Sequence, residues 1–306
     1  MLEKIVKLFN LLIAESRMPH YGGQALIEGV LMRGRKYVVA VMRKPDDSLH
    51  LEEEKLKGLY TSGLAKIPFF RGLVVLWDSL FLGMKYITLS ANLQSEEDDE
   101  KIEGPMLFFT LILSLSLSIG LFFVFPTFII EVLNRILPLS QLLMNVLEGF
   151  MRLFLLIAYI WAIGKTKDIA RVFAYHGAEH KTINAYENGA NITIESVRNF
   201  PLAHPRCGTS FLLTLVILSI VVFTIIGPIP SLPLKIISRI GFVPIIAMLA
   251  YELIRWTGDH SDNIFVKLMT EPNLMLQQLT TQEPSDDMLE VAITSFNKLI
   301  KLEEAN

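Results

Sequence analysis

The stretch at residues 104–130, GPMLFFTLILSLSLSIGLFFVFPTFII, contains no charged side chain. Residues 207–234 form a second run without charge. Each run exceeds the roughly 18 apolar residues that indicate a transmembrane helix through a hydrocarbon core of about 30 Å. Charged residues make up 19% of the chain, whereas soluble domains average about 25%. The sequence therefore predicts an α-helical integral membrane protein that associates with the lipid bilayer.

The apolar runs predict about four transmembrane helices in two hairpins, at residues 106–130, 139–163, 209–227 and 236–256. Together they define a membrane domain over residues 104–256, with a polar segment at 164–208 between the hairpins. Glu148 and Arg152 lie one helical turn apart within the second helix. Ionisable groups at membrane depth normally face the protein interior and find partners, so we expect an ion pair that fixes helix packing.

Residues 1–66 are expected to form an amphipathic helix followed by a small α+β unit. Apolar residues recur at helical spacing near the N-terminus, a pattern typical of a helix on a membrane surface or on a partner. The segments 37–43 and 48–54 read as strands, and the turn residues Pro45-Asp46-Asp47-Ser48 connect them. The unit is therefore expected to contain a β-hairpin.

Residues 67–103 are expected to be an interfacial helix and an acidic linker. The helical part, 67–94, is apolar but is interrupted by three charged residues, Arg71, Asp78 and Lys85. Charges are costly in lipid, so an interfacial or partly embedded position is favoured, and a true transmembrane helix is the alternative. The run EEDDEKIE at 96–103 is expected to be a solvated linker.

The C-terminal segment, residues 257–306, is expected to be cytoplasmic and to end in a helix at 285–302. Apolar residues recur there at helical spacing, and Pro284-Ser285-Asp286 supplies an N-cap signal. We expect this helix to dock on the N-terminal α+β unit.

Basic residues are distributed unevenly between the two sides of the predicted membrane domain. The 164–208 segment carries Lys165, Lys167, Arg171, Lys181, Arg198 and Arg206, whereas the opposite loops carry Arg135, Lys235 and Arg239. Basic residues concentrate on the cytoplasmic side, so this segment and both termini are predicted to be cytoplasmic. A reduced Cys207 fits that compartment. The net charge of −3 gives no support for nucleic-acid binding.

The central segment contains the motif YHGAEHK at residues 175–181. On a helix, His176 and His180 lie one turn apart on the same face, and two imidazoles at that spacing can hold one zinc ion. Glu179 occupies the place of the general base in an inverted zinc-protease motif. Glu187 returns to nearly the same face further along the helix. Two histidines packed on an ordinary helix are the alternative interpretation.

A second motif, HPRCG at residues 204–208, places His204 and Cys207 at the spacing of a metal knuckle. Together with the two helix histidines they complete a set of three nitrogens and one sulfur. Four protein ligands form a closed structural site, whereas catalysis requires one position for water. For a catalytic site, either one of the four residues does not bind the metal or a carboxylate replaces it.

Two further carboxylates each have more than one interpretation. Glu252, near the cytoplasmic end of the last predicted transmembrane helix, is a metal ligand, a partner of a metal ligand or the ion-pair partner of Arg255. Glu28, in ALIEGVLMRG, is positioned for function or forms a structural pair with Arg33 or Arg35.

A resemblance to a known family is carried by GGQALIEGVLMRG, IPFFRGL, AYHGAEHKTINAYE, HPRCGTSFL, AYELIRW and LQQLTTQEPSDDMLEVAI, in this order. Over residues 20–298 the chain resembles the YqhQ-like family of bacterial membrane proteins, which are described as predicted metal-dependent enzymes. The resemblance implies a multi-pass protein of the bacterial cytoplasmic (inner) membrane. The positions that match the family's motifs are Glu28, His176, Glu179, His180, His204, Arg206, Cys207 and Glu252.

These residues predict a zinc-dependent membrane enzyme, a hydrolase acting on a membrane-proximal peptide or a lipid-like substrate at the cytoplasmic face. In this hypothesis the histidines bind the metal together with Cys207 or Glu252, and Glu179 acts as general base. The alternative is a non-enzymatic membrane scaffold or small transporter with a structural metal site. An open coordination position would favour the enzyme, and a closed site of three histidines and a cysteine would favour the alternative.

Overall fold

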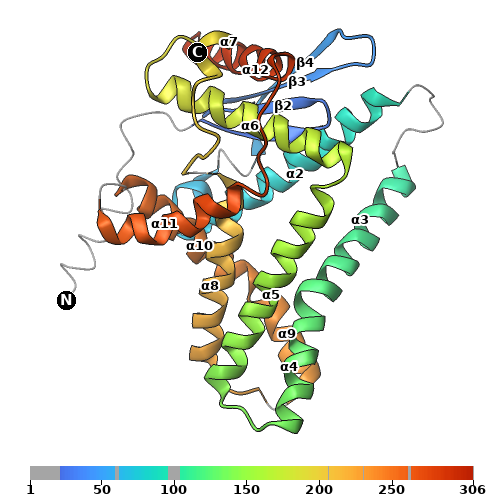
Figure 1. Ribbon diagram of the computed structural model, residues 1–306, viewed down its shortest axis with the longest axis vertical. Helices are drawn as coiled ribbons and strands as arrows, with labels where there is room; N and C mark the ends of the chain where they lie inside the picture. Colours follow the sequence, from blue (N-terminus) through green and yellow to red (C-terminus); the bar gives the residue numbers. More distant parts are fainter. Residues whose placement is uncertain are drawn as a thin grey trace.

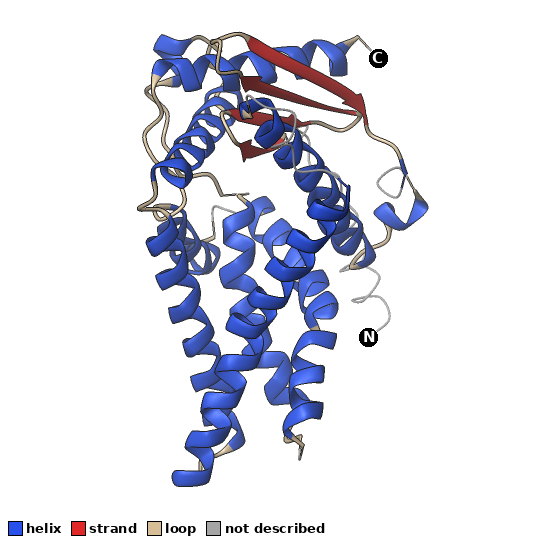
Figure 2. Cartoon of the chain, turned by 90° about the vertical axis from the view of Figure 1, so that its right-hand side faces the viewer, coloured by secondary structure: helices blue, strands red, loops and turns tan. Residues whose placement is uncertain are grey.

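The computed structural model describes residues 21–58, 62–95, 104–205, 207–229, 231–260 and 263–305. These residues are mostly helical, with one small antiparallel sheet near the N-terminus. Long helices extend from a unit in which strands and helices pack together (Figure 1), and the strands lie at one end of the molecule (Figure 2). The predicted N-terminal amphipathic helix, the acidic run at 96–103 and Arg206 lie outside the described residues.

The helices and strands belong to two parts of the molecule, the unit that contains the sheet and the group of long helices. The helices are α2 (Phe70–Gln94), α3 (Gly104–Ile119), α4 (Phe125–Ile136), α5 (Gln141–Ile163), α6 (Lys167–Glu187), α7 (Ile194–Val197), α8 (Gly208–Ile226), α9 (Leu232–Gly241), α10 (Val243–Asp259), α11 (Ile264–Gln277) and α12 (Asp286–Glu304). The strands are β1 (Gly22–Leu26), β2 (Gly29–Arg33), β3 (Tyr37–Arg43) and β4 (Leu49–Lys55).

The sheet is an antiparallel meander in the order β1-β2-β3-β4. The predicted hairpin is confirmed as β3 and β4, with the second strand beginning at Leu49 rather than at residue 48. Asp47 adopts a left-handed conformation with φ 64° in its turn. The amide and hydroxyl of Ser48 both donate to the Asp46 carboxylate, so the turn has the local side-chain bonding expected of aspartate and serine.

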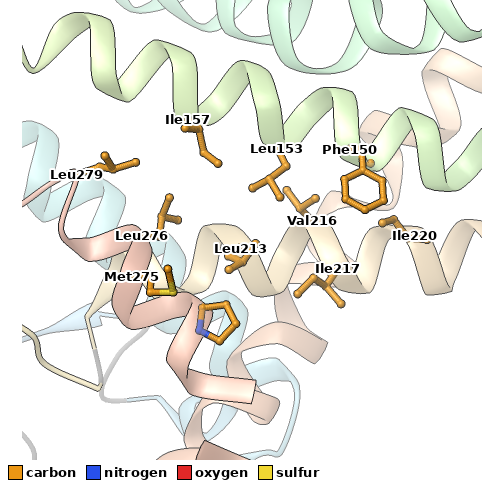
Figure 3. Close-up of a pocket in the computed structure, with 12 residues that line it drawn as sticks. Phe150, Leu153, Ile157, Leu213, Val216, Ile217, Ile220, Met275, Leu276 and Leu279 are labelled. Carbon is orange, nitrogen blue, oxygen red and sulfur yellow. The ribbon is translucent and has the colours of Figure 1, made fainter. Parts of the chain in front are cut away.

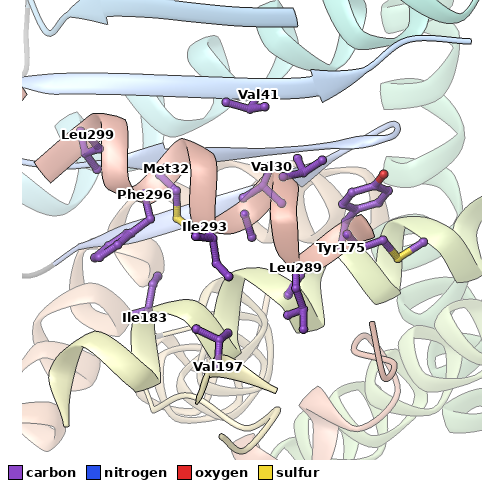
Figure 4. Close-up of a cluster of buried hydrophobic side chains, with 14 of the residues drawn as sticks. Val30, Met32, Val41, Tyr175, Ile183, Val197, Leu289, Ile293, Phe296 and Leu299 are labelled. Atoms are coloured by element: carbon purple, nitrogen blue, oxygen red, sulfur yellow. The ribbon is translucent and has the colours of Figure 1, made fainter. Parts of the chain in front are cut away.

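Both faces of β3 are covered, so its central residues are all buried. Successive side chains of a strand point to opposite faces of a sheet. Val39 and Val41 pack in one cluster with residues of α6 and α12 (Figure 4). Val38 packs in the other cluster with Leu82 and Tyr86 of α2. The N-terminal sheet is therefore completed by helices from the middle and the end of the chain.

The predicted C-terminal helix is confirmed as α12, which begins after Ser285 and docks on the sheet. Leu289 and Phe296 are fully buried in the shared core. The Ser295 hydroxyl donates to the carbonyl oxygen of Val39 at 2.9 Å. Arg43 at the end of β3 pairs with Glu290 at 2.7 Å. Apolar burial and two polar contacts thus fix α12 across the sheet.

By length and composition, four described helical segments can cross a membrane: Phe70–Gln94, Gly104–Ile136, Gln141–Ile163 and Leu232–Thr257. Three of them correspond to predicted transmembrane helices. The remaining predicted one corresponds to α8, whose apolar part at Phe211–Ile226 is shorter. The added candidate is α2, which was expected to be interfacial. Its Asp78 and Lys85 pair with Arg33 and Glu54 of the sheet, which supports the interfacial interpretation.

The predicted helix at 236–256 lies within the candidate membrane-spanning segment Leu232–Thr257, in which a turn separates α9 from α10. Phe242 lies between them, with φ −83° and ψ −8°. Gly241 weakens the helix at this point, and Pro244 has no backbone N–H to continue the hydrogen-bond ladder. Helix α11, which contains Pro272, was not predicted at all and packs against α8.

The predicted Glu148–Arg152 pair is confirmed and belongs to a larger buried network. Arg239 of α9 also pairs with Glu148, at 2.9 Å, and the hydroxyl of Thr127 donates to the same carboxylate at 2.7 Å. Arg152 in turn donates to the carbonyl oxygen of Phe122. That carbonyl lies in a π-helical segment, Gly120–Val124, between α3 and α4. The network connects three helices deep inside the helical part.

Candidate metal centre

Helix α6 confirms the predicted helix and carries the YHGAEHK motif on its buried half. Gly177 allows the chain after α11 to approach this helix closely. A Cβ atom there would lie 2.1 Å from the carbonyl oxygen of Gln282, far inside a normal contact. On the other side, the amide of Asn184 donates to the carbonyl oxygens of Pro201 and Ala203. Two loops are thus held against the two histidines.

These loops orient both histidine rings. Nδ1 of His176 lies 2.8 Å from the carbonyl oxygen of Thr280, and Nδ1 of His180 lies 2.5 Å from that of Leu202. A carbonyl oxygen only accepts hydrogen bonds, so each Nδ1 carries the proton. In the neutral ring, Nε2 is then the nitrogen that carries the lone pair. Metal-binding histidines are typically oriented in this way.

Cys207 completes the group of potential ligands. Its Sγ lies 3.2 Å from Nε2 of His176, and one ligand atom from each of His176, His180 and Cys207 lies within 4.8 Å of the other two. Two nitrogens and a sulfur at normal zinc bond lengths would be separated by about 3.3–3.6 Å in a tetrahedral site. The donor set therefore fits zinc after small side-chain shifts.

The position of Cys207 at the start of α8 suits a negatively charged sulfur. Cys207 is the N-cap of the helix, and the backbone N–H of Thr209 donates to Sγ at 3.5 Å. The amides at a helix N-terminus favour negative charge, and cysteine binds metals as the thiolate. All three residues are largely or fully buried, so water has limited access to the site.

The structure does not bring His204 into this group, so the four-ligand set is not assembled. Nε2 of His204 lies 3.3 Å from a carboxylate oxygen of Glu187. Gln277 fixes the backbone of His204, accepting from its N–H at 2.9 Å and donating to its carbonyl oxygen at 2.8 Å. The ring centroids of His204 and His180 are 5.6 Å apart. His204 and Glu187 therefore form a neighbouring pair beside the candidate ligands.

Glu179 of α6 lies close to His176 and borders β1 of the sheet. One of its carboxylate oxygens is 3.9 Å from Nε2 of His176. Gly23 of β1 allows this approach, because a Cβ there would lie 2.8 Å from the Glu179 side chain. Burial raises the pKa of Glu179 to about 7, while His176 and a backbone hydrogen bond with Gly23 act in the opposite direction. Such a carboxyl group exchanges a proton near neutral pH.

Glu252 is not placed as a metal ligand, and its expected pairing with Arg255 is replaced by another. Its carboxylate binds the buried Arg71 of α2 through both oxygens, and it also accepts from the backbone N–H of Phe69 at 2.9 Å. This pair connects α10 to α2. Both partners are buried, so the contact is structural.

Glu28 also has a different partner from those expected. It lies at the β1–β2 turn with φ 52° and binds Arg171 of α6 through two contacts, at 2.5 and 2.6 Å. The hydroxyl of Tyr175 donates to it at 3.1 Å. Arg33 pairs with Asp78 of α2 instead. Glu28 therefore ties the sheet to the helix that carries the motif.

Fold and site together define a mostly helical protein with four candidate membrane-spanning helices, a small sheet and a histidine–cysteine group beside it. Residues 67–302 match the family described as "Protein of unknown function (DUF1385)", and the chain belongs to this family. It is 35% identical over 299 residues to "Uncharacterized protein YqhQ" of Bacillus subtilis (strain 168), with 93% of each chain covered. This confirms the family resemblance. No solved structure matches the chain.

Proposed function

We propose that the chain is a metal-dependent hydrolase that acts at a membrane surface and uses zinc held by His176, His180 and Cys207. The observation that carries the proposal is the orientation of the two rings. Thr280 and Leu202 bind the Nδ1 atoms, so the Nε2 lone pairs remain for a metal beside the sulfur. Two histidines that merely filled a core would not need a third metal-binding group at this distance.

The number of candidate ligands favours an enzyme over a structural site. Catalytic zinc sites have three protein ligands and keep one position for water or substrate, whereas structural sites have four. The pairing of His204 with Glu187 leaves three ligands in the group. A bound zinc ion would lower the pKa of a coordinated water to about 7 and polarise the bond that is cleaved.

Glu179 is the group that would handle the proton. In ester or amide hydrolysis, water adds its hydroxyl to the carbonyl carbon, the bond to the leaving oxygen or nitrogen breaks, and the leaving atom takes up a proton. The Glu179 carboxylate accepts the proton from water and returns it to the leaving atom. Its place 3.9 Å from His176 Nε2, in a buried setting, supports this role.

The proposed setting is the cytoplasmic face of the bacterial inner membrane, with both termini in the cytoplasm. The four candidate membrane-spanning helices support a multi-pass chain. The excess of basic residues in the segment that carries the site supports the orientation. A substrate reached from this position would be a membrane-proximal peptide bond or the ester of a lipid-like molecule.

The test begins with the zinc content of the detergent-purified chain, measured by mass spectrometry. One zinc ion per chain is expected in the wild type, and its loss is expected in His180→Ala. His50→Ala is the matched control, because His50 lies on β4 beside Glu52 and outside the group. Absence of zinc from the wild type after reconstitution would overturn the proposal.

Glu179→Gln separates an enzyme from a metal-stabilised scaffold. This variant is expected to keep its zinc and to hydrolyse lipid esters or peptide bonds at least about 100-fold more slowly, which is the usual effect of losing a general base. Full activity in Glu179→Gln would exclude its proposed role. Zinc binding without hydrolysis of any ester or amide by the wild type would favour the scaffold or transporter.

A further inference from the structure

An apolar groove of about 460 Å³ lies between α5, α8 and α11 (Figure 3). Its volume falls within the range of about 300–1,000 Å³ that is typical of small-molecule sites. Every residue that lines it is apolar. The walls include Leu153 and Ile157 of α5, Leu213 and Ile217 of α8, Met275 of α11 and Leu279 beyond it.

Close packing of α5 and α8 forms one wall of the groove. A Cβ at Gly149 would lie 2.4 Å from the side chain of Ile220, so a larger residue there would push the two helices apart. Helix α5 is a candidate membrane-spanning helix, and α8 is a shorter apolar one. A groove between such helices that has no polar groups would exclude water and accept hydrocarbon.

Two of the chain segments that line the groove also lead to the candidate metal centre. Helix α8 begins directly after Cys207. At 1.5 Å per residue, Leu213 lies about 9 Å along the axis from Cys207, and Ile220 lies about 20 Å from it. The chain beyond α11 also reaches the site, because Thr280, next to the groove-lining Leu279, binds Nδ1 of His176.

We propose that this groove holds an acyl chain of a membrane lipid and directs the lipid's polar head toward His176 and Cys207. The inference rests on the proposed function and selects the lipid among its substrates. The volume of about 460 Å³ is that of a small-molecule site, which favours a single hydrocarbon chain over the larger surface of a peptide segment. A hydrocarbon chain that ends in a polar group matches both the groove and the polar cluster at its end.

The experiment uses the full chain in vesicles of phosphatidylethanolamine and phosphatidylglycerol. These vesicles contain a trace of phospholipid with a photoreactive group either at the end of an acyl chain or on the head. Mass spectrometry then maps the cross-linked peptides. The tail probe is expected to label α5, α8 and α11, and the head probe is expected to label the peptides that contain His176 or Cys207.

Two substitutions fill the groove from different walls, Ile217→Trp on α8 and Met275→Trp on α11. Each is expected to lower cross-linking of both probes at least about tenfold, the effect of losing the contacts of roughly two methylene groups. Ile225→Trp is the matched control, because Ile225 also lies on α8 but is 79% exposed and does not line the groove. Zinc content is measured for every variant.

Equal labelling of the control and the groove variants would show that lipid only surrounds the helices, and it would overturn the proposal. Cross-links from the groove to a second copy or to another protein would also overturn it, in favour of a protein partner. If the His180→Ala variant lacks zinc but the tail probe still labels its groove, the proposed lipid site is supported without the metal centre. Thus a failed metal centre and a failed lipid groove give different results.

Discussion

Nδ1 of His176 donates a hydrogen bond to the carbonyl oxygen of Thr280, at a distance of 2.8 Å and across 104 positions of the sequence. The contact joins the middle of α6 to the loop between α11 and α12. It fixes which nitrogen carries the proton, and it sets the direction in which Nε2 points. The candidate metal centre therefore depends on how closely this loop approaches α6.

Replacing Gly177 by alanine is expected to disturb that approach, although it adds a single methyl group. The new Cβ would lie 2.1 Å from the carbonyl oxygen of Gln282, so the loop must move away from α6. Loss of the partners of metal-binding histidines typically lowers metal affinity by about 10–100-fold. A zinc titration of Gly177→Ala should show a decrease of that size. Gly241→Ala is the control, because nothing lies within 4 Å of its new Cβ, and equal affinities would contradict the prediction.

Glu252→Gln is expected to leave the zinc content unchanged and to lower stability. The carboxylate binds Arg71 and the backbone N–H of Phe69, away from the candidate ligands. Removing one charge from a buried pair typically costs about 3–5 kcal/mol. Zinc analysis and thermal unfolding in detergent measure the two effects separately. Loss of zinc together with unchanged stability would show instead that Glu252 belongs to the metal centre.

Glu148→Gln is expected to destabilise the helical part strongly. It removes the negative charge that faces both Arg152 and Arg239, and all three side chains are buried. The expected cost is again about 3–5 kcal/mol, because the buried guanidinium groups lose their counter-charge. Glu54→Gln, which breaks the more exposed pair with Lys85, should cost at most about 1 kcal/mol. Similar unfolding temperatures for the two variants would argue against a structural role of the network.

Phe296→Ala tests whether α12 is part of the sheet unit. The ring is fully buried and packs edge to face against Tyr21 and Tyr186. Its removal is expected to cost about 3–5 kcal/mol, the usual range for phenylalanine in a core. Leu117→Ala on α3, at a side chain that is 65% exposed, should change stability little. Unfolding monitored by circular dichroism compares the two, and equal losses would contradict the observed docking.

The sequence predicted the elements whose signals are local. The apolar run of β3 and the turn residues before β4, the spacing of His176 and His180 and the periodicity of α12 each depend on neighbouring residues. The bond between His176 and Thr280 could not be predicted, because any residue type can supply a backbone carbonyl. The role of Leu202 was missed for the same reason, whereas that of Gly23 was missed because its neighbours in the sequence do not show that Glu179 approaches it.

Charge pairs also show that the sequence alone does not identify contacts between distant residues. A pair with Arg255, one turn away, was one alternative for Glu252, but Glu252 binds Arg71, which is 181 positions distant. A pair with Arg33 or Arg35 was one alternative for Glu28, but Glu28 binds Arg171. Proximity in the sequence identifies a partner only when both residues lie one turn apart on the same helix and face each other, as Glu148 and Arg152 do. Tertiary packing decides the other pairs.

The bond between Ser295 and Val39 has a consequence for the order in which the molecule is completed. Val39 is synthesised early, and Ser295 follows 256 residues later. A ribosome therefore synthesises the helices between these two residues before α12 is available to cover the strands, and contacts so distant in sequence form late. A prematurely terminated chain has its long apolar helices but an open sheet beside α6. Until α12 has been made, the strands that it covers lack one of their packing partners.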